Sequence, residues 1–205
     1  SNLNDVAKIM GLDSRIGKDF LKAGLGYGGS CFPKDTLSLL NTAENVGSDL
    51  GIVSSAVKTN EYMKEYLLNK IISKVGDVKN KNIAVLGLSF KPETDDIRES
   101  PSISLIRKIV YAGGHVKVYC PKAMKNAKIE MDDIKDCVTF TKNEYQCTQN
   151  TDMLVLATEW EQFKDLDFIK IKNHMNSNYF FDLRNMFVDK ENIKNMFHYY
   201  PVGIS

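Results

Sequence analysis

One stretch, residues 24–35, places a thiol, an amine and a carboxylate directly after a glycine-rich turn. Its sequence is Gly-Leu-Gly-Tyr-Gly-Gly-Ser-Cys-Phe-Pro-Lys-Asp, with four glycines in the first six residues. Pro33 suits the first turn of a helix, because its fixed φ matches and its missing N–H needs no partner there. Cys31 is thus predicted at a helix N-terminus, where the helix dipole and Lys34 favour the thiolate. With Asp35 to orient a water or move a proton, the stretch predicts covalent catalysis by an activated thiol.

Two simpler interpretations of this stretch stay open. A glycine-rich turn before a proline-started helix is common punctuation, and a lone cysteine is more often a small buried hydrophobe than a nucleophile. The Gly-x-Gly-x-Gly-Gly spacing also resembles a dinucleotide-binding fingerprint. That fingerprint follows a buried strand, however, and residues 18–23 lack the pattern of one, so we reject a Rossmann phosphate loop here.

Composition limits the class of protein. The 205 residues are 43% hydrophobic, enough for a substantial core in one or two domains. A formal charge of +1 gives no overall electrostatic case for nucleic-acid or membrane partners. The sequence has no apolar run of about 18 residues and no basic-plus-apolar leader, so neither a membrane span nor a signal peptide is predicted. Its four cysteines show no CxxC pairing and no metal-ligand spacing, which favours a cytoplasmic protein without disulfides or a metal site.

Residues 1–76 are predicted to form a helical central segment. Apolar residues recur at three- to four-residue intervals in three stretches, which we assign as helices over 4–10, 33–46 and 52–75. The last helix would be about 36 Å long, more than one small domain needs. Its periodicity alone also fits a simple core helix.

From residue 77 the composition turns polar and the period changes, so we place a domain boundary there and a second domain over 77–205. Beyond it strands and helices alternate, which implies right-handed βαβ units. The fold class is therefore predicted as α/β, the helical segment being followed by a Rossmann-like, doubly wound parallel sheet. The expected strands are 83–86, 116–119, 138–141, 153–157, 179–182 and 199–202, and the expected helices are 102–112, 143–148, 163–172 and 190–196.

Three groups of polar residues follow expected strands: Phe90-Lys91, residues 158–160 (Thr-Glu-Trp) and Arg184. In open parallel sheets ligands bind beyond the carboxyl ends of the strands, where the strand order reverses. A lysine and an arginine converging there would suit a diphosphate. Either one alone is more simply a solvated surface cation. Trp160 is more simply core filling, and we leave it out of the site.

The chain also resembles a known family. The segment 26–35, preceded by Asp-Ser-Arg-Ile-Gly at 13–17 and Phe-Leu-Lys at 20–22, is similar to the active-site segment of the UDP-glucose/GDP-mannose dehydrogenase family. The similarity continues in family order over essentially the whole chain, through segments 87–92, 95–100, 158–160 and 181–184.

The resemblance assigns roles to individual residues. It implies that Cys31 is the nucleophile and Asp35 its acidic helper, and that Lys34 and Arg98 approach the cofactor NAD. Arg15 would reach a ligand across a homodimer. The substrate contacts that it implies are Phe20, Leu21, Lys22, Ala23, Gly24, Gly28, Phe90, Lys91 and Arg184. A lysine and an asparagine that assist the chemistry in the family have no match here.

The resemblance further implies oxidation of UDP-glucose to UDP-glucuronate with two NAD, through a thiohemiacetal and a thioester on the cysteine. It predicts that this chain is the C-terminal half of such an enzyme without the N-terminal NAD-binding domain, and that alone it only binds the UDP-sugar and dimerises through helix 52–75. Open alternatives are a dehydrogenase for another nucleotide sugar, such as GDP-mannose or a UDP-N-acetylhexosamine, and a non-catalytic UDP-binding module.

Overall fold

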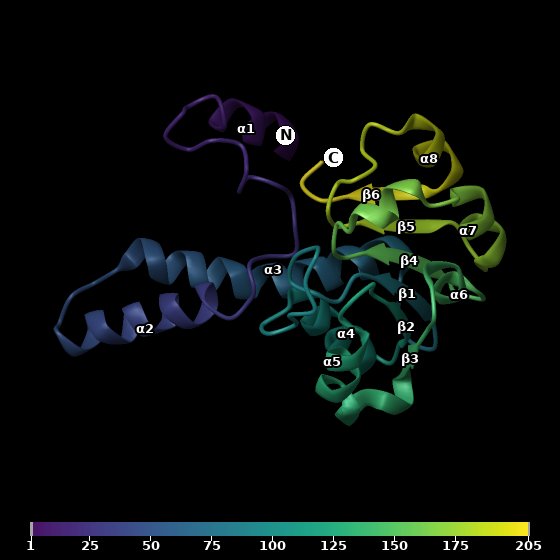
Figure 1. Cartoon of the computed structure of the whole chain (residues 1–205), viewed down its shortest axis with the longest axis horizontal. Coiled ribbons are helices and arrows are strands. Elements are labelled where there is room, and N and C mark those ends of the chain that lie inside the picture. The colour runs from purple at the N-terminus through teal and green to yellow at the C-terminus, as the bar shows by residue number, and fades with distance from the viewer. Residues whose placement is uncertain (1, 205) are drawn as a thin grey trace.

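The N-terminal part of the chain is helical in the computed structural model, which describes residues 2–204. Its helices are α1 (Leu3–Met10), α2 (Phe32–Asn45) and the 25-residue α3 (Gly51–Val75). Figure 1 shows α2 and the first half of α3 as a hairpin that projects away from the rest of the molecule. The segment between α1 and α2 runs past α3 on its way to this hairpin.

The remainder of the chain forms one six-stranded parallel sheet in the order β3-β2-β1-β4-β5-β6. The predicted α/β class and doubly wound sheet are therefore confirmed. The order reverses between β1 and β4, which is where ligands bind in such sheets. The strands are β1 (Asn82–Leu86), β2 (His115–Tyr119), β3 (Val138–Phe140), β4 (Met153–Leu156), β5 (Tyr179–Asp182) and β6 (His198–Pro201).

The helices between the strands agree with the predictions in part. They are α4 (Pro101–Tyr111), α5 (Met124–Glu130), η1 (Asp132–Cys137), α6 (Glu144–Thr148), η2 (Glu161–Asp165), α7 (Phe168–His174) and α8 (Glu191–Met196), where η marks a 3-10 helix. The single helix predicted over 163–172 is wrong: the chain breaks into η2 and α7, because the side chain of Asp167 caps a new helix by accepting from the Lys170 N–H. We did not predict α5 or η1.

The core lies between the sheet and its covering helices, and it includes the second half of α3. Strands β1 and β4 are almost wholly buried, because both of their faces are covered. Leu67 and Ile71 of α3 are buried in the same apolar cluster, whereas Ile52 at the start of α3 is 89% exposed. The long helix thus packs on the sheet domain with one half and leaves the other half in the projecting hairpin. Within residues 2–204 no helix is both long and apolar enough to cross a membrane.

A buried carboxylate ties β5 to β6 and shapes the turn after β5. Asp182 is fully buried and accepts hydrogen bonds from the Arg184 N–H at 3.2 Å, the Phe187 N–H at 2.9 Å and the Tyr199 hydroxyl at 2.6 Å. Burial raises the pKa of both Asp182 and Tyr199. The Asp182 carboxylate thereby fixes the backbone of Arg184, the residue that follows the end of β5 by two positions.

We expect Tyr199→Phe to lower the free energy of unfolding by about 1–2 kcal/mol, because the buried Asp182 loses one of its donors. Urea unfolding measures this. Tyr200→Phe is the matched control, since within the described residues the Tyr200 hydroxyl makes no hydrogen bond, and its ring stacks on Phe181. Equal losses in the two variants would show that Asp182 does not depend on the Tyr199 hydroxyl.

Candidate active site

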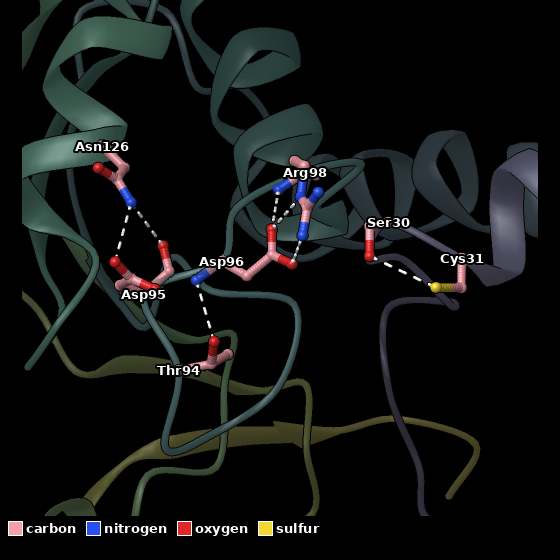
Figure 2. A network of polar contacts seen from close by, with 7 residues as sticks. All are labelled: Ser30, Cys31, Thr94, Asp95, Asp96, Arg98 and Asn126. Carbon is pink, nitrogen blue, oxygen red and sulfur yellow. Dashed lines mark hydrogen bonds and ion pairs between the residues drawn. The ribbon is translucent and has the colours of Figure 1, made fainter.

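Cys31 caps the N-terminus of α2, and Pro33 lies in the first turn of that helix, so the predicted helix start is confirmed. The thiol is exposed. Its Sγ lies 3.6 Å from Oγ of Ser30, within reach of an O–H···S hydrogen bond (Figure 2). An exposed thiol at a helix N-terminus is in a favourable position to act as a nucleophile.

Lys34 and Asp35 follow the thiol within one helical turn. Their side chains form an exposed ion pair, with Nζ of Lys34 2.5 Å from Oδ1 of Asp35. This hydrogen bond raises the pKa of Lys34, with smaller contributions from the charges of Asp35 and Cys31. Lys34 therefore stays positively charged beside the thiol. The role of Asp35 beside the thiol stays a prediction.

The glycine-rich segment before Cys31, residues 23–30, lies across the carboxyl edge of the sheet; we call it the strap. Asn60 of α3 holds its middle, because Oδ1 of Asn60 accepts from the Tyr27 N–H at 2.8 Å and Nδ2 donates to the Tyr27 carbonyl at 3.3 Å. The Gly29 N–H donates to the Arg98 carbonyl at 2.9 Å. No strand leads into the strap, which is consistent with our rejection of a Rossmann phosphate loop.

Two glycines of the strap allow this close approach. At Gly26, where φ is +124°, an added Cβ would lie 2.4 Å from Oδ1 of Asn60. At Gly24 it would lie 2.0 Å from Nη1 of Arg184. Any larger residue at either position would push the strap off α3 or off the arginine.

The loop after β1 presents Arg98 beside the strap in a fixed orientation. Asp96 accepts from the Arg98 backbone N–H at 3.0 Å and from Nε and Nη2 of its side chain at 2.9 and 2.7 Å. These bonds lower the pKa of Asp96 and raise that of Arg98. Asn126 of α5 anchors the same loop through both the carbonyl and the carboxylate of Asp95 (Figure 2).

Ser89, at the end of β1, fixes the residues that follow β4. Its carbonyl accepts from the Thr158 hydroxyl at 2.7 Å, and its own hydroxyl accepts from Nε1 of Trp160 at 3.2 Å. Trp160 is only 2% exposed, in agreement with its predicted place in the core. The residue between these two anchors, Glu159, points its side chain toward Arg184.

Glu159 and Arg184 form a half-buried ion pair across the ends of β4 and β5. Nη2 of Arg184 lies 2.5 Å from Oε1 of Glu159, and the two side chains are 15% and 19% exposed respectively. Arg184 Nε and Glu159 Oε2 are both buried and have no hydrogen-bond partner among the described residues. The pair therefore depends on a single contact.

Three adjoining cavities connect this ion pair with the thiol. A cavity of about 740 Å³ is lined by Phe20, Lys22, Gly24, Gly28, Phe32, Phe90, Lys91, Glu159 and Arg184, among others. A smaller one of about 380 Å³ shares Gly28, Phe32, Phe90 and Lys91 with it and adds Cys31, Thr94 and Asp96. The third, of about 850 Å³, lies on the other side of Cys31, beside Lys34 and Arg98. Among residues 2–204, no cluster of side chains has the composition of a metal site.

The structure brings together most of the residues that the sequence analysis selected. Leu21 and Ala23 belong to the same segment but do not line the three cavities, and neither does Asp35 of α2. Arg15 lies apart from them: its exposed guanidinium pairs with Asp13, with Nη2 and Oδ2 2.7 Å apart. Its role across a dimer stays a prediction.

Several cavity residues were outside the selected set. Glu159 was noted only as part of a polar cluster, and Phe32, Thr94, Asp96 and Asn60 were not singled out. For Phe32 the available signal was its place next to Cys31. For Asn60 the signal was a polar residue on the otherwise apolar face of a long helix.

Comparison with known proteins places the chain in a family. Residues 1–62 match the model of the UDP-glucose/GDP-mannose dehydrogenase family, central domain, and residues 84–189 match that of its UDP binding domain. The UDP-glucose 6-dehydrogenase of Rhizobium meliloti is 42% identical over 204 residues, which are 99% of this chain and 46% of that protein. The UDP-glucose 6-dehydrogenase TuaD of Bacillus subtilis is 36% identical over 203 residues, covering 99% and 43%.

Solved structures agree. A UDP-glucose dehydrogenase from Pyrobaculum islandicum is 32% identical, with a TM-score of 0.76 over 88% of this chain and 43% of that one. A UDP-D-ManNAc dehydrogenase from Pyrococcus horikoshii is 26% identical, with a TM-score of 0.78 over 99% and 44%. The chain spans about half the length of the relatives it matches. Over that span, it belongs to the UDP-glucose/GDP-mannose dehydrogenase family.

Proposed function

We propose that this chain supplies the nucleophilic cysteine and the nucleotide-sugar pocket of an NAD-dependent UDP-glucose 6-dehydrogenase. The observation that carries the proposal is the continuity of the cavities. Lys91 lines both the cavity that holds Arg184 and the one that holds Cys31. A diphosphate held by these two cations would leave its sugar in the smaller cavity, against the thiol.

In this arrangement Cys31 makes the second oxidation possible. The C6 alcohol of the sugar first loses a hydride and a proton to give an aldehyde. The thiolate of Cys31 adds to the aldehyde carbon as a thiohemiacetal, whose oxidation by loss of a second hydride gives a thioester. Water then attacks the thioester carbonyl, the C–S bond breaks, and the carboxylate leaves. The covalent bond keeps the reactive aldehyde in place between the two oxidations.

We infer that Lys34, Asp35 and Arg98 assist this sequence. Lys34 keeps a positive charge beside the thiolate, and Asp35 orients the water that attacks the thioester. Lys34 and Arg98 line the 850 Å³ cavity on the far side of Cys31, and their cationic side chains fit an anionic dinucleotide. Lys34 and Arg98 would hold NAD there, and the cofactor would supply the hydride acceptor for both oxidations.

Two other functions use the same pocket. The family includes enzymes for other nucleotide sugars, so GDP-mannose or a UDP-N-acetylhexosamine is the second substrate candidate. A non-catalytic UDP-binding module is the second class of function. Calorimetric titration of the chain with UDP-glucose, GDP-mannose and a UDP-N-acetylhexosamine ranks the substrate candidates. NADH formation after adding NAD and UDP-glucose would show that the chain alone is catalytic.

We also propose that the chain forms a homodimer through α2 and α3, and that it works in the cytoplasm. The projecting hairpin exposes large apolar side chains along both helices, which a partner would remove from water. They are Leu37, Leu39, Val46, Ile52 and Tyr62. The four cysteines are free, which suits a reducing compartment.

Arg184→Ala is expected to weaken UDP binding by about 1.5–3 kcal/mol, the usual contribution of a charged hydrogen bond. Calorimetric titration of the 205-residue chain with UDP measures the change. Arg107→Ala is the matched control, because Arg107 pairs with Asp133 and lines none of the three cavities. Unchanged affinity in Arg184→Ala would contradict the assigned pocket.

Iodoacetamide is expected to alkylate Cys31 faster than the other three cysteines, and to keep doing so as the pH falls toward 6. Cys120 and Cys147 are buried, and burial raises the pKa of Cys147 to about 12. Lys34→Ala should slow alkylation of Cys31 several-fold near neutral pH, because the variant removes the positive charge beside the thiol. Peptide mass spectrometry over a pH series reads each cysteine separately.

The control for this series is Lys58→Ala, which removes an exposed lysine of α3 that lines none of the cavities. If the alkylation rate of Cys31 falls with pH in parallel with that of Cys137, the thiol is not activated at the helix terminus.

Ile52→Glu is expected to convert the dimer to a monomer, because it places a charge on the exposed apolar side of the hairpin. Sedimentation equilibrium on the chain and on this variant measures the change. Ile129→Glu, at a residue of α5 that is 73% exposed, controls for added charge elsewhere. A monomer at high concentration for the unmodified chain would reject dimerisation through this hairpin.

A further inference from the structure

We propose that Glu159 is a positioning residue, which holds the Arg184 guanidinium in the orientation that receives a nucleoside diphosphate. The inference rests on the pocket proposed above and adds a specific role for a carboxylate within it. It has an unusual consequence: removing a negative charge from an anion-binding cavity should weaken anion binding.

The first argument is that both ends of the pair are fixed before the side chains meet. Thr158 and Trp160, on either side of Glu159, are each bonded to Ser89. On the neighbouring strand, the Arg184 N–H donates to Asp182. Parallel strands β4 and β5 pair Leu156 with Asp182, so Glu159 and Arg184 follow adjacent strand ends at almost the same height. Glu159 and Arg184 lie in the loops that follow β4 and β5, and hydrogen bonds to Ser89 and Asp182 fix these loops beside the pair.

The second argument is that Arg184 has few other restraints on its side chain. Nη2 contacts Glu159, and Nη1 lies against Gly24, where only a glycine leaves room. Nε has no partner among the described residues. Within the described residues, Glu159 is the only charged partner of this largely buried guanidinium, so without its carboxylate the guanidinium would turn away from the cavity toward water.

The third argument is that positioning and simple electrostatics predict opposite signs. Glu159 lines the same cavity as Lys22, Lys91 and Arg184, so its charge repels a diphosphate bound there. If repulsion dominated, Glu159→Gln would bind the anion more tightly. If orientation of Arg184 dominates, the same variant binds it less tightly. The sign of the change identifies the role of the residue.

The experiment is a double-mutant cycle read by calorimetric titration of the 205-residue chain with UDP. Glu159→Gln is expected to weaken binding about tenfold, within the range for a charged hydrogen bond. In the Arg184→Ala background there is no guanidinium to position, so the same substitution should instead tighten binding about two- to fivefold through lost repulsion. Glu161→Gln is the matched control and should leave the affinity unchanged, because Glu161 pairs with Lys164 on the surface.

Unchanged or tighter binding of UDP by Glu159→Gln would overturn the inference, and so would equal weakening in both backgrounds. If Glu159→Gln does not fold, as judged by circular dichroism, Glu159→Asp takes its place. That variant keeps the charge and shortens the reach, so weaker binding supports positioning and full affinity overturns it. Failure of the unmodified chain to bind UDP would overturn the proposed pocket and this inference together, whereas normal binding with a failed cycle would leave the pocket standing.

Discussion

The candidate site depends on the contact between the strap and the carboxyl edge of the sheet. Residues 23–30 carry no regular secondary structure, so their backbone N–H and C=O groups need partners from elsewhere. Asn60 supplies two and the Arg98 carbonyl a third. Each such bond contributes roughly 0.5–1.5 kcal/mol, and together they set where α2 begins. The thiol is therefore placed by a long-range polar contact, although its helix looks like a local feature.

The position of the strap depends in turn on the half of α3 that belongs to the core. Leu67 and Ile71 hold the second half of α3 against the sheet, and Asn60 lies two turns earlier on the same helix. Burial of Leu67 and Ile71 thereby fixes the side-chain amide of Asn60 beside the cavities. Beyond Asn60 toward its N-terminus the helix leaves the sheet, and its apolar side chains are exposed together with those of α2.

The sequence predicts those features that depend on neighbouring residues better than those that depend on residues far apart in the chain. The buried runs of β1 and β4 and the proline-started α2 depend on local pattern, and parallel topology explains why Lys91 and Arg184 lie together. The Glu159–Arg184 contact depends on the register between β4 and β5, and the Asn60 contact joins residues 33 apart, so the partner in neither contact can be predicted from local pattern. The segment that forms α5 and η1 carried a local signal, since Ala127, Met131 and Ile134 are buried at helical spacing, but its lysine-rich sequence between two strands resembles a polar loop.

Three of the five cations selected for ligand contact within the cavities already have a carboxylate partner: Lys34 has Asp35, Arg98 has Asp96 and Arg184 has Glu159, whereas Lys22 and Lys91 have none within residues 2–204. Lys91 instead lies over the Phe90 ring, 5.3 Å from its centroid, without an ion-pair partner among the described residues. Pairing lowers the net positive charge that attracts an anion. It also limits the rotamers of these side chains before the ligand arrives. This reduces the conformational entropy lost on binding, which is up to about 2 kcal/mol for each free side chain. A pocket of paired cations therefore discriminates between anionic ligands mainly through the directions of its N–H donors. A ligand whose oxygens do not lie along those directions gains little, because the net positive charge of the pocket is small.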